Sequence, residues 1–205
     1  MKNKIALKTA FIAALISVAL SFYSCKQKGE NDFEEISISV DKNRIGDEFV
    51  EMNLKFKFNP PKGWLLKPSE LTEKIVSRQK SEKEGGDSFL YKPLYVFFSD
   101  STKGILTIGT VDNNDSAKTA PQIQRYIDEL IAKYDRKNVT VQNFIKDKIM
   151  ISHLTIEKQS IATQKMIFKN SDGRFIQFDY TLQKDMMPKE EKAIESSLGT
   201  LKLVK

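Results

Sequence analysis

Hydrophobic and polar residues alternate with period two through much of this chain, a pattern that predicts short strands with one buried face. The pattern begins at 54–58, where Leu54, Phe56 and Phe58 are separated by lysines. Further β-rich segments follow at 94–98, 105–111, 139–145, 148–156, 162–168 and 174–182. Polar or glycine-containing stretches separate these segments and predict tight turns, of which Asn-Ser-Asp-Gly at 170–173 is the strongest.

Two segments have the three- and four-residue apolar spacing of an amphipathic helix. The first spans 120–134 and includes Leu130; the second spans 189–198, and Gly199 is predicted to cap it. A shorter helix is predicted over 68–76. Because short links join most of the strands, the order of elements favours an antiparallel β-sheet flanked by helices, an α+β fold.

The first 24 residues have the layout of a secretory signal peptide. Basic residues precede the apolar run 10–20, and the small residue Ser24 stands directly before Cys25. A transmembrane anchor needs about 20 apolar residues, whereas this run is shorter and Lys8 precedes it. We therefore expect a signal peptide over 1–24 and cleavage between Ser24 and Cys25.

The residues at the cleavage site indicate lipidation. Ser-Phe-Tyr-Ser-Cys at 21–25 resembles a bacterial lipoprotein lipobox of the looser kind found in Bacteroidetes, with Phe22 where the strict pattern prefers leucine. The resemblance implies that Cys25 becomes the acylated first residue of the mature chain, carrying palmitate-like lipid and no other cofactor. A free thiol is the alternative, but a lone exported cysteine cannot form an internal disulfide.

This reading divides the chain into three parts. The signal peptide is followed by a lipidated N-terminus and flexible tether over 25–51, and then by one folded domain over 52–205. Within the tether, 36–40 alternates and predicts an edge strand. Lys26 after the cysteine favours the outer membrane by the enterobacterial pattern, while the face on which the domain lies, periplasmic or exterior, is left open by the sequence.

Charge excludes one class of partner. The chain has 33 basic and 27 acidic residues, a net of +6. Three of the lysines lie in the predicted leader, so the mature net charge is 30 minus 27, or +3. This is too little for the concentrated basic surface of a nucleic-acid-binding protein.

The sequence contains no catalytic or metal-binding signature, so we expect no enzymatic activity. His153 is the single histidine, and strand alternation places it with Ile149 and Ile151 as a partly buried structural residue. Asp-Asn-Asn-Asp at 112–115 has oxygen ligands suited to calcium but lacks the spaced acidic series of a calcium loop, so a turn is favoured.

Three further patterns mark candidate surface sites. Ser116 in Asp-Ser-Ala and Ser101 in Asp-Ser-Thr resemble the short O-glycosylation acceptor of exported Bacteroidetes proteins. Asn138 begins an N-glycosylation tripeptide, which has little weight in a bacterial chain. Trp64, beside a turn, is the candidate ligand-binding aromatic, with core packing as the favoured alternative.

The segment 56–64, Phe-Lys-Phe-Asn-Pro-Pro-Lys-Gly-Trp, resembles the first strand and Pro-x-Gly-Trp turn of PsbP-like domains, which are related to the Mog1/PsbP and DcrB-like folds. The resemblance implies an α/β/α sandwich that acts as a non-enzymatic binding, assembly or chaperone-like module with an envelope protein as partner. The alternative is a carbohydrate-active or hydrolytic envelope accessory protein, because catalytic carboxylates scattered in sequence can meet in the fold.

Overall fold

The computed structural model describes residues 33–68, 73–74, 88–113 and 123–204. They belong to a compact unit that begins at Phe33. Its larger sheet consists of β1 (Glu34–Glu35), β4 (Trp64–Leu66), β5 (Phe89–Ser99), β6 (Ile105–Asn113), β7 (Val139–Lys146), β8 (Ile149–Lys158), β9 (Ile161–Lys169) and β10 (Phe175–Gln183). The smaller sheet and the helices are β2 (Phe49–Glu51), β3 (Phe56–Phe58), β11 (Lys202–Leu203), α3 (Ile123–Tyr134), α4 (Met187–Gly199) and the 3-10 turns η1 (Lys42–Arg44) and η2 (Arg136–Asn138).

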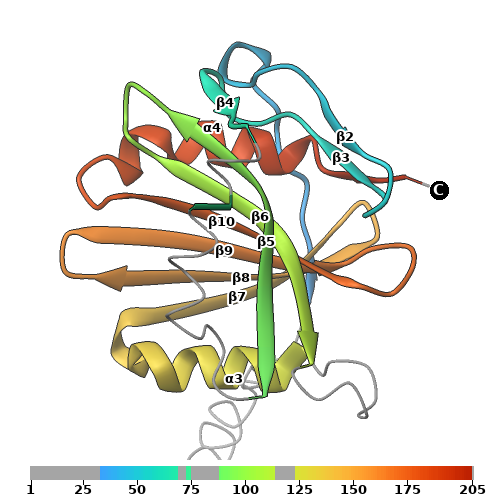
Figure 1. Ribbon diagram of the computed structural model, residues 1–205, viewed down its shortest axis with the longest axis vertical. Coiled ribbons are helices and arrows are strands. Elements are labelled where there is room, and N and C mark those ends of the chain that lie inside the picture. Colours follow the sequence, from blue (N-terminus) through green and yellow to red (C-terminus); the bar gives the residue numbers. More distant parts are fainter. Residues whose placement is uncertain (1–32, 69–72, 75–87, 114–122, 205) are drawn as a thin grey trace, which may run out of the picture. The chain divides into compact units, whose positions relative to one another are not determined.

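The larger sheet is built mainly from hairpins. Its strand order is β1-β7-β8-β9-β10-β6-β5-β4, so β7 to β10 are neighbours in both sequence and space (Figure 1). Every pair is antiparallel except β1 and β7. The β7–β8 turn has positive φ at Asp147 and Lys148, the backbone of a two-residue hairpin loop. The predicted antiparallel sheet is therefore confirmed.

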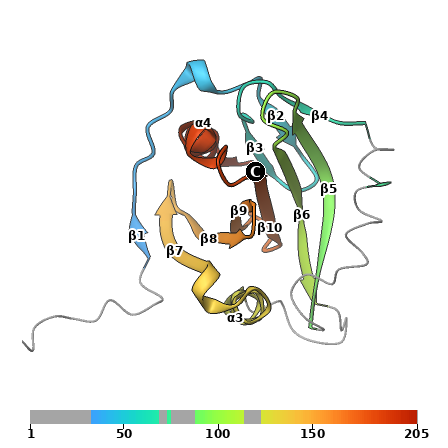
Figure 2. The same cartoon turned by 90° about the vertical axis from the view of Figure 1, so that its left-hand side faces the viewer.

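Both faces of the central strands are buried. On one face, Ile151 of β8 and Phe178 of β10 join a core cluster that includes Ile194 of α4. On the other face, Leu154 of β8 joins a second cluster that includes Leu130 of α3. Figure 2 shows α4 and α3 on opposite sides of these strands. The strand alternation thus explains why the sheet has a helix on each face.

The face covered by α4 also carries the smaller sheet. Phe56 and Phe58 of β3 pack edge-on against Phe178, with ring centroids 5.3 and 4.9 Å apart. The layer that covers this face of β8–β10 therefore consists of a helix, α4, and the smaller sheet. The α+β class is as predicted, but the flanking layer is richer in strands than a purely helical one.

Residues 36–41, which we call the N-terminal strap, run past the end of α4. Ile36 donates its backbone N–H to the Ile145 carbonyl at 2.9 Å, and Asp41 donates its N–H to Ser196 Oγ at 3.2 Å. The side chains of Ile36 and Ile38 pack on the α4 cluster. The structured unit thus begins at Phe33 instead of Met52, because the alternating isoleucines are used to cover the core.

Several predicted details differ in the structure. The edge strand expected at 36–40 is not formed, and the pairing with β7 lies just before it, at Glu34 and Glu35 of β1. Gly199 is the last residue of α4, and a Cβ there would lie 2.7 Å from Val40 Cγ2. The glycine is needed for close approach of the strap and does not serve as a left-handed cap. The helix predicted over 68–76 lies outside the described residues except for 68 and 73–74.

Substitution of Leu130 tests the packing of α3. Leu130 is fully buried beneath the helix, so Leu130→Asp would bury an unpaired carboxylate and should destabilise the domain by several kcal/mol. Ala132→Asp, at an exposed position of the same helix, should cost less than about 1 kcal/mol. Urea unfolding of both variants is the measurement. Equal midpoints would show that α3 does not contribute to the core.

Candidate functional site

Trp64 lies in the core. Its side chain is 3% exposed, its Nε1–H donates to Glu190 Oε2 at 3.2 Å, and its ring packs against Tyr180 at 5.9 Å. A Cβ on Gly104 would lie 2.7 Å from the indole. The structure therefore assigns Trp64 to packing, which corrects its candidacy as a ligand-binding aromatic.

The other predicted surface sites are only partly described. Ser101 is exposed in the β5–β6 turn, and its hydroxyl lies 3.1 Å from Ser99 Oγ. Ser24, Cys25 and Ser116 lie outside the described residues, and so does the second half of the 112–115 turn. Within the described part of the chain, no group of three or more His, Cys, Asp or Glu residues is arranged to hold a metal ion.

His153 is on the face predicted for it, with Ile149 and Ile151 of the same strand in the α4 cluster. Its ring lies edge-on to Phe144 at 6.5 Å. Burial lowers the pKa of His153 to about 4, and its Nε2 has no hydrogen-bond partner among the described residues. The imidazole is thus neutral at pH 7 and far from the pKa that acid–base catalysis at that pH requires.

A buried polar network lies on the opposite face, beneath α3. Lys165 of β9 donates to Asp179 Oδ2 of β10 at 2.8 Å, and Gln177 Nε2 donates to the same oxygen at 2.9 Å. Tyr126 of α3 donates its hydroxyl to Gln177 Oε1 at 2.8 Å. All four side chains are buried, so this network links β9, β10 and α3 and offers no exposed binding surface.

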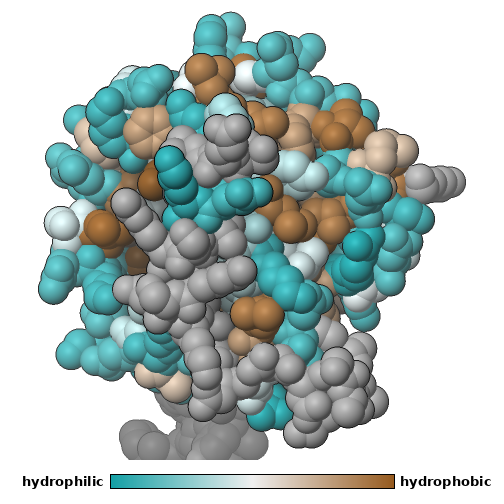
Figure 3. Space-filling view, viewed as in Figure 1, coloured by the Kyte–Doolittle hydropathy of each residue, from teal (hydrophilic) through white to brown (hydrophobic). Residues whose placement is uncertain are grey.

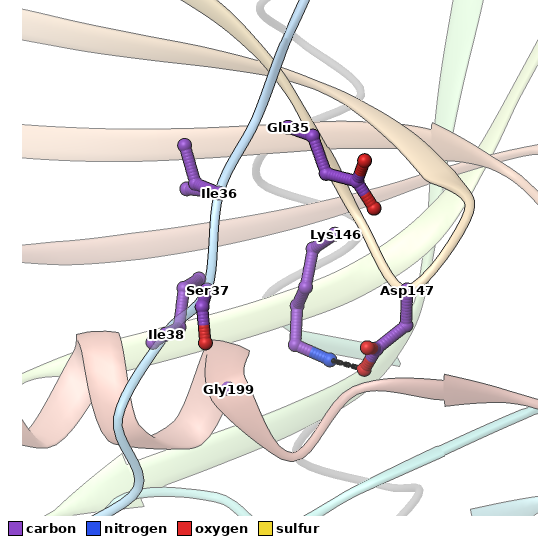
Figure 4. Close-up of a pocket in the computed structure, with 7 residues that line it drawn as sticks. All are labelled: Glu35, Ile36, Ser37, Ile38, Lys146, Asp147 and Gly199. Carbon is purple, nitrogen blue, oxygen red and sulfur yellow. Dashed lines mark hydrogen bonds and ion pairs between the residues drawn. The ribbon is translucent and has the colours of Figure 1, made fainter.

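A polar hollow opens between the N-terminal strap, the β7–β8 turn and the end of α4. Its volume is about 350 Å³, within the range of sites that hold small molecules. The lining residues are Glu35, Ile36, Ser37, Ile38, Lys146, Asp147 and Gly199. Figure 4 shows Lys146 between Ser37 of the strap and Asp147 of the turn. We call it the Lys146 hollow.

The ammonium of Lys146 is the central group of the hollow. Its side chain is only 4% exposed, and its Nζ donates to Asp147 Oδ2 at 2.6 Å and to the Leu201 carbonyl at 3.0 Å. An ammonium has three N–H donors. The described residues therefore satisfy two donors of a buried cation and leave the third for a ligand or solvent.

The Asp147 carboxylate of the hollow remains ionised at neutral pH. The hydrogen bond and the charge of Lys146 lower the pKa of Asp147, and the charge of Lys202 adds to this effect. Glu35 is exposed and has no ion-pair partner among the described residues. The hollow consequently presents hydrogen-bond acceptors on one side and the Lys146 donor within it.

Sequence reasoning missed this site. It treated Lys146 and Asp147 as a polar break between strands and Glu35 as part of a tether. One signal was available, because alternation along β7 puts Lys146 on the same face as the buried Phe144. The strap that completes the hollow comes from a distant part of the chain and has no local signature.

Exposed apolar side chains form a second surface feature. Those of Val50, Met52, Leu65, Leu66 and Leu94 are between 44% and 61% exposed and lie on or next to β2, β4 and β5. Figure 3 shows brown apolar groups interrupted by hydrophilic side chains on the face in view. Single exposed apolar residues are ordinary, and a concentration of them is a feature of protein-binding surfaces.

Comparison with known proteins identifies structural likenesses only. The chain is similar to the cyanobacterial PsbP protein, CyanoP, from Synechocystis, with 13% identity, a TM-score of 0.49, and coverage of 88% of this chain and 97% of CyanoP. A protein from Bacteroides thetaiotaomicron is similar over 78% of this chain and 49% of its own length, with 14% identity and a TM-score of 0.38. The protein PA94 of unknown function from Pseudomonas aeruginosa has 10% identity, a TM-score of 0.37, and coverage of 77% and 95%.

Neither a protein-family model nor a curated protein matches the sequence. In the part of the chain that the structure describes, no helix has the length and apolar character needed to cross a membrane.

The buried histidine predicts a pH dependence of stability. In the unfolded chain the pKa is near 6.5, and in the folded protein it is about 4. Between these values the unfolded state binds more protons, so His153 should make the protein less stable as pH falls from 6.5 to 4, by roughly 3 kcal/mol in total. His153→Gln should remove this component.

Urea unfolding of wild type and His153→Gln between pH 7 and pH 4 is the measurement. Carboxylates titrate in the same range, and subtracting the variant's pH profile from that of wild type removes their common contribution. A difference that stays constant across the range would contradict burial of a neutral imidazole.

Proposed function

We propose that this protein is a non-enzymatic binding module of a bacterial cell envelope, held at the membrane by lipid on Cys25. The observation that carries the binding role is the Lys146 hollow, where a buried ammonium has two of its three donors satisfied by described residues and the exposed Glu35 also lines the cavity. Desolvated polar groups that retain hydrogen-bonding capacity favour a bound ligand, because leaving them without a partner is costly.

The pKa shifts support binding over catalysis. General acid–base groups work best with a pKa near the operating pH. Here the pKa of His153 is lowered to about 4, that of Asp147 is lowered by Lys146, and that of Tyr95 is raised to about 12 by burial and by Glu51. Each of these groups is moved away from neutrality, which is unsuitable for hydrolysis at neutral pH.

The proposed anchor would hold the domain near the membrane. Cys25 and Phe33, where the compact unit begins, are eight residues apart (33 minus 25). A fully extended chain of that length spans at most about 28 Å. The acylated cysteine would therefore keep the strap and the Lys146 hollow close to the lipid surface, most consistently the outer membrane.

The exposed apolar residues of β2, β4 and β5 are the surface that we assign to a protein partner of the envelope. Leu65 and Leu66 belong to β4, an edge strand of the larger sheet, and Val50 belongs to β2, an edge strand of the smaller one. Edge strands offer backbone hydrogen-bonding groups to a partner as well as their side chains.

Substitution of the cysteine tests the anchor. Wild-type protein should fractionate with membranes and show acyl mass on Cys25 by intact-mass analysis, whereas Cys25→Ser should be released or mislocalised because no thiol is present to acylate. Gln27→Ser, a change to serine two residues further on, is the control and should behave as wild type. A soluble wild-type protein without acyl mass would refute the anchor.

Site-specific photo-crosslinking tests the partner. With a photo-reactive phenylalanine at Leu66, the full chain in its own envelope should capture a specific protein, because Leu66 is 48% exposed on an edge strand. The same group at Met150, which is 58% exposed on β8, is the control and should not capture that protein. Capture at both positions or neither would reject this surface.

The alternative of a hydrolase is tested with the purified protein. Turnover of an envelope polymer by the purified protein, abolished by Asp147→Asn together with Glu35→Gln, would overturn the non-enzymatic proposal. We expect no turnover, because the lowered pKa of Asp147 leaves this group ionised at neutral pH and without a proton to donate as a general acid.

A further inference from the structure

The groups that line the Lys146 hollow specify the chemistry of its ligand. The third N–H of Lys146 requires an acceptor, and the Glu35 carboxylate requires a donor. The hydroxyl of Ser37, exposed on the strap and without a hydrogen-bond partner among the described residues, can do either. A ligand that satisfies all three must both donate and accept hydrogen bonds.

The charges of the hollow disfavour an ionic ligand. An anion that accepts from Lys146 would lie beside the Asp147 carboxylate, which is bound to the same ammonium at 2.6 Å. Like charges at that range repel. A cation at Glu35 would leave the third Lys146 donor without an acceptor.

Neutral hydroxyl groups meet both requirements. A hydroxyl oxygen accepts a hydrogen bond while its own proton is donated, so neighbouring hydroxyls can bridge the Lys146 donor and the Glu35 acceptor. Ile36 and Ile38, whose side chains pack on the α4 cluster, form the apolar part of the lining. The volume of about 350 Å³ limits the bound part to one or two sugar units.

We infer that the Lys146 hollow binds a neutral, polyhydroxylated ligand, namely a sugar unit of an envelope glycan. The inference rests on the proposed binding function and names its ligand class. Lys146 donates to a ring hydroxyl oxygen, Glu35 accepts from an adjacent hydroxyl, and Ser37 bonds a third. Gly199, whose missing side chain lets the strap pass close to the end of α4, also lines the hollow (Figure 4).

Ligand-observed NMR with the full-length protein is the test. The probes are the methyl glycosides of glucose, galactose, mannose and N-acetylglucosamine, with acetate, methylammonium and glycine as ionic comparisons. At least one glycoside should bind with a Kd in the millimolar range, as expected for a small open site. Acetate, methylammonium and glycine should not displace it.

Variants connect binding to the hollow. Glu35→Gln and Ser37→Ala change exposed residues and should each weaken glycoside binding about fivefold. The first replaces a charged acceptor by a weaker neutral one, and the second removes a hydroxyl. Lys146→Met keeps the length of the side chain and should abolish binding. Glu34→Gln is the matched control, because Glu34 is the neighbouring exposed carboxylate of β1 and does not line the hollow.

The outcomes separate this inference from the proposed function. Failure of every glycoside to bind, binding that all three variants leave unchanged, or displacement by an ionic probe would each overturn the inference. If Lys146→Met does not fold, Glu35→Gln and Ser37→Ala decide the result. Capture of an envelope protein at Leu66 without any glycoside binding would preserve the binding module and reject the sugar site.

Discussion

Burial of both faces of β8, β9 and β10 is the constraint on which the rest of the structure depends. Apolar residues on opposite faces of these strands serve two cores, as Phe178 of β10 does on one face and Ile167 of β9 on the other. One helix cannot cover both faces, so α3 and α4 pack on opposite sides. The smaller sheet and the N-terminal strap complete the α4 side, which is wider than one helix can cover.

Polar residues inside this arrangement restrict how it can form. The buried pair of Lys165 and Asp179 lies directly across β9 and β10, and Gln177 connects it to Tyr126 of α3. A buried ion pair contributes little net stability. Removing one partner, however, leaves the other charge buried without a counter-charge and destabilises the protein. Because a slip of one residue would turn these groups to the other face, the network fits only one register of the two strands.

The same packing that completes the core also creates the candidate site. Ile36 and Ile38 anchor the strap on the α4 cluster, and this brings Glu35 to the end of β7, where Lys146 is already buried. Gly199 allows the strap to pass at close range. Binding in the Lys146 hollow and anchoring through the strap therefore involve one segment, so a ligand there would contact the part of the chain nearest the proposed lipid.

Sequence alone determined the elements whose signal is local. Strands β5 to β10, the β5–β6 hairpin and α3 follow from apolar periodicity and turn residues, and so does the face on which His153 lies. The three-residue strands β2 and β4 were not predicted, because they lack the alternation of apolar and polar residues that marks β3. Tertiary structure decided that Trp64 belongs to the core, that the strap belongs to the fold, and that Lys146 and Glu35 line the same hollow. These outcomes depend on contacts between residues far apart in the chain, and periodicity describes only which face of an element is buried, not which distant segment covers it.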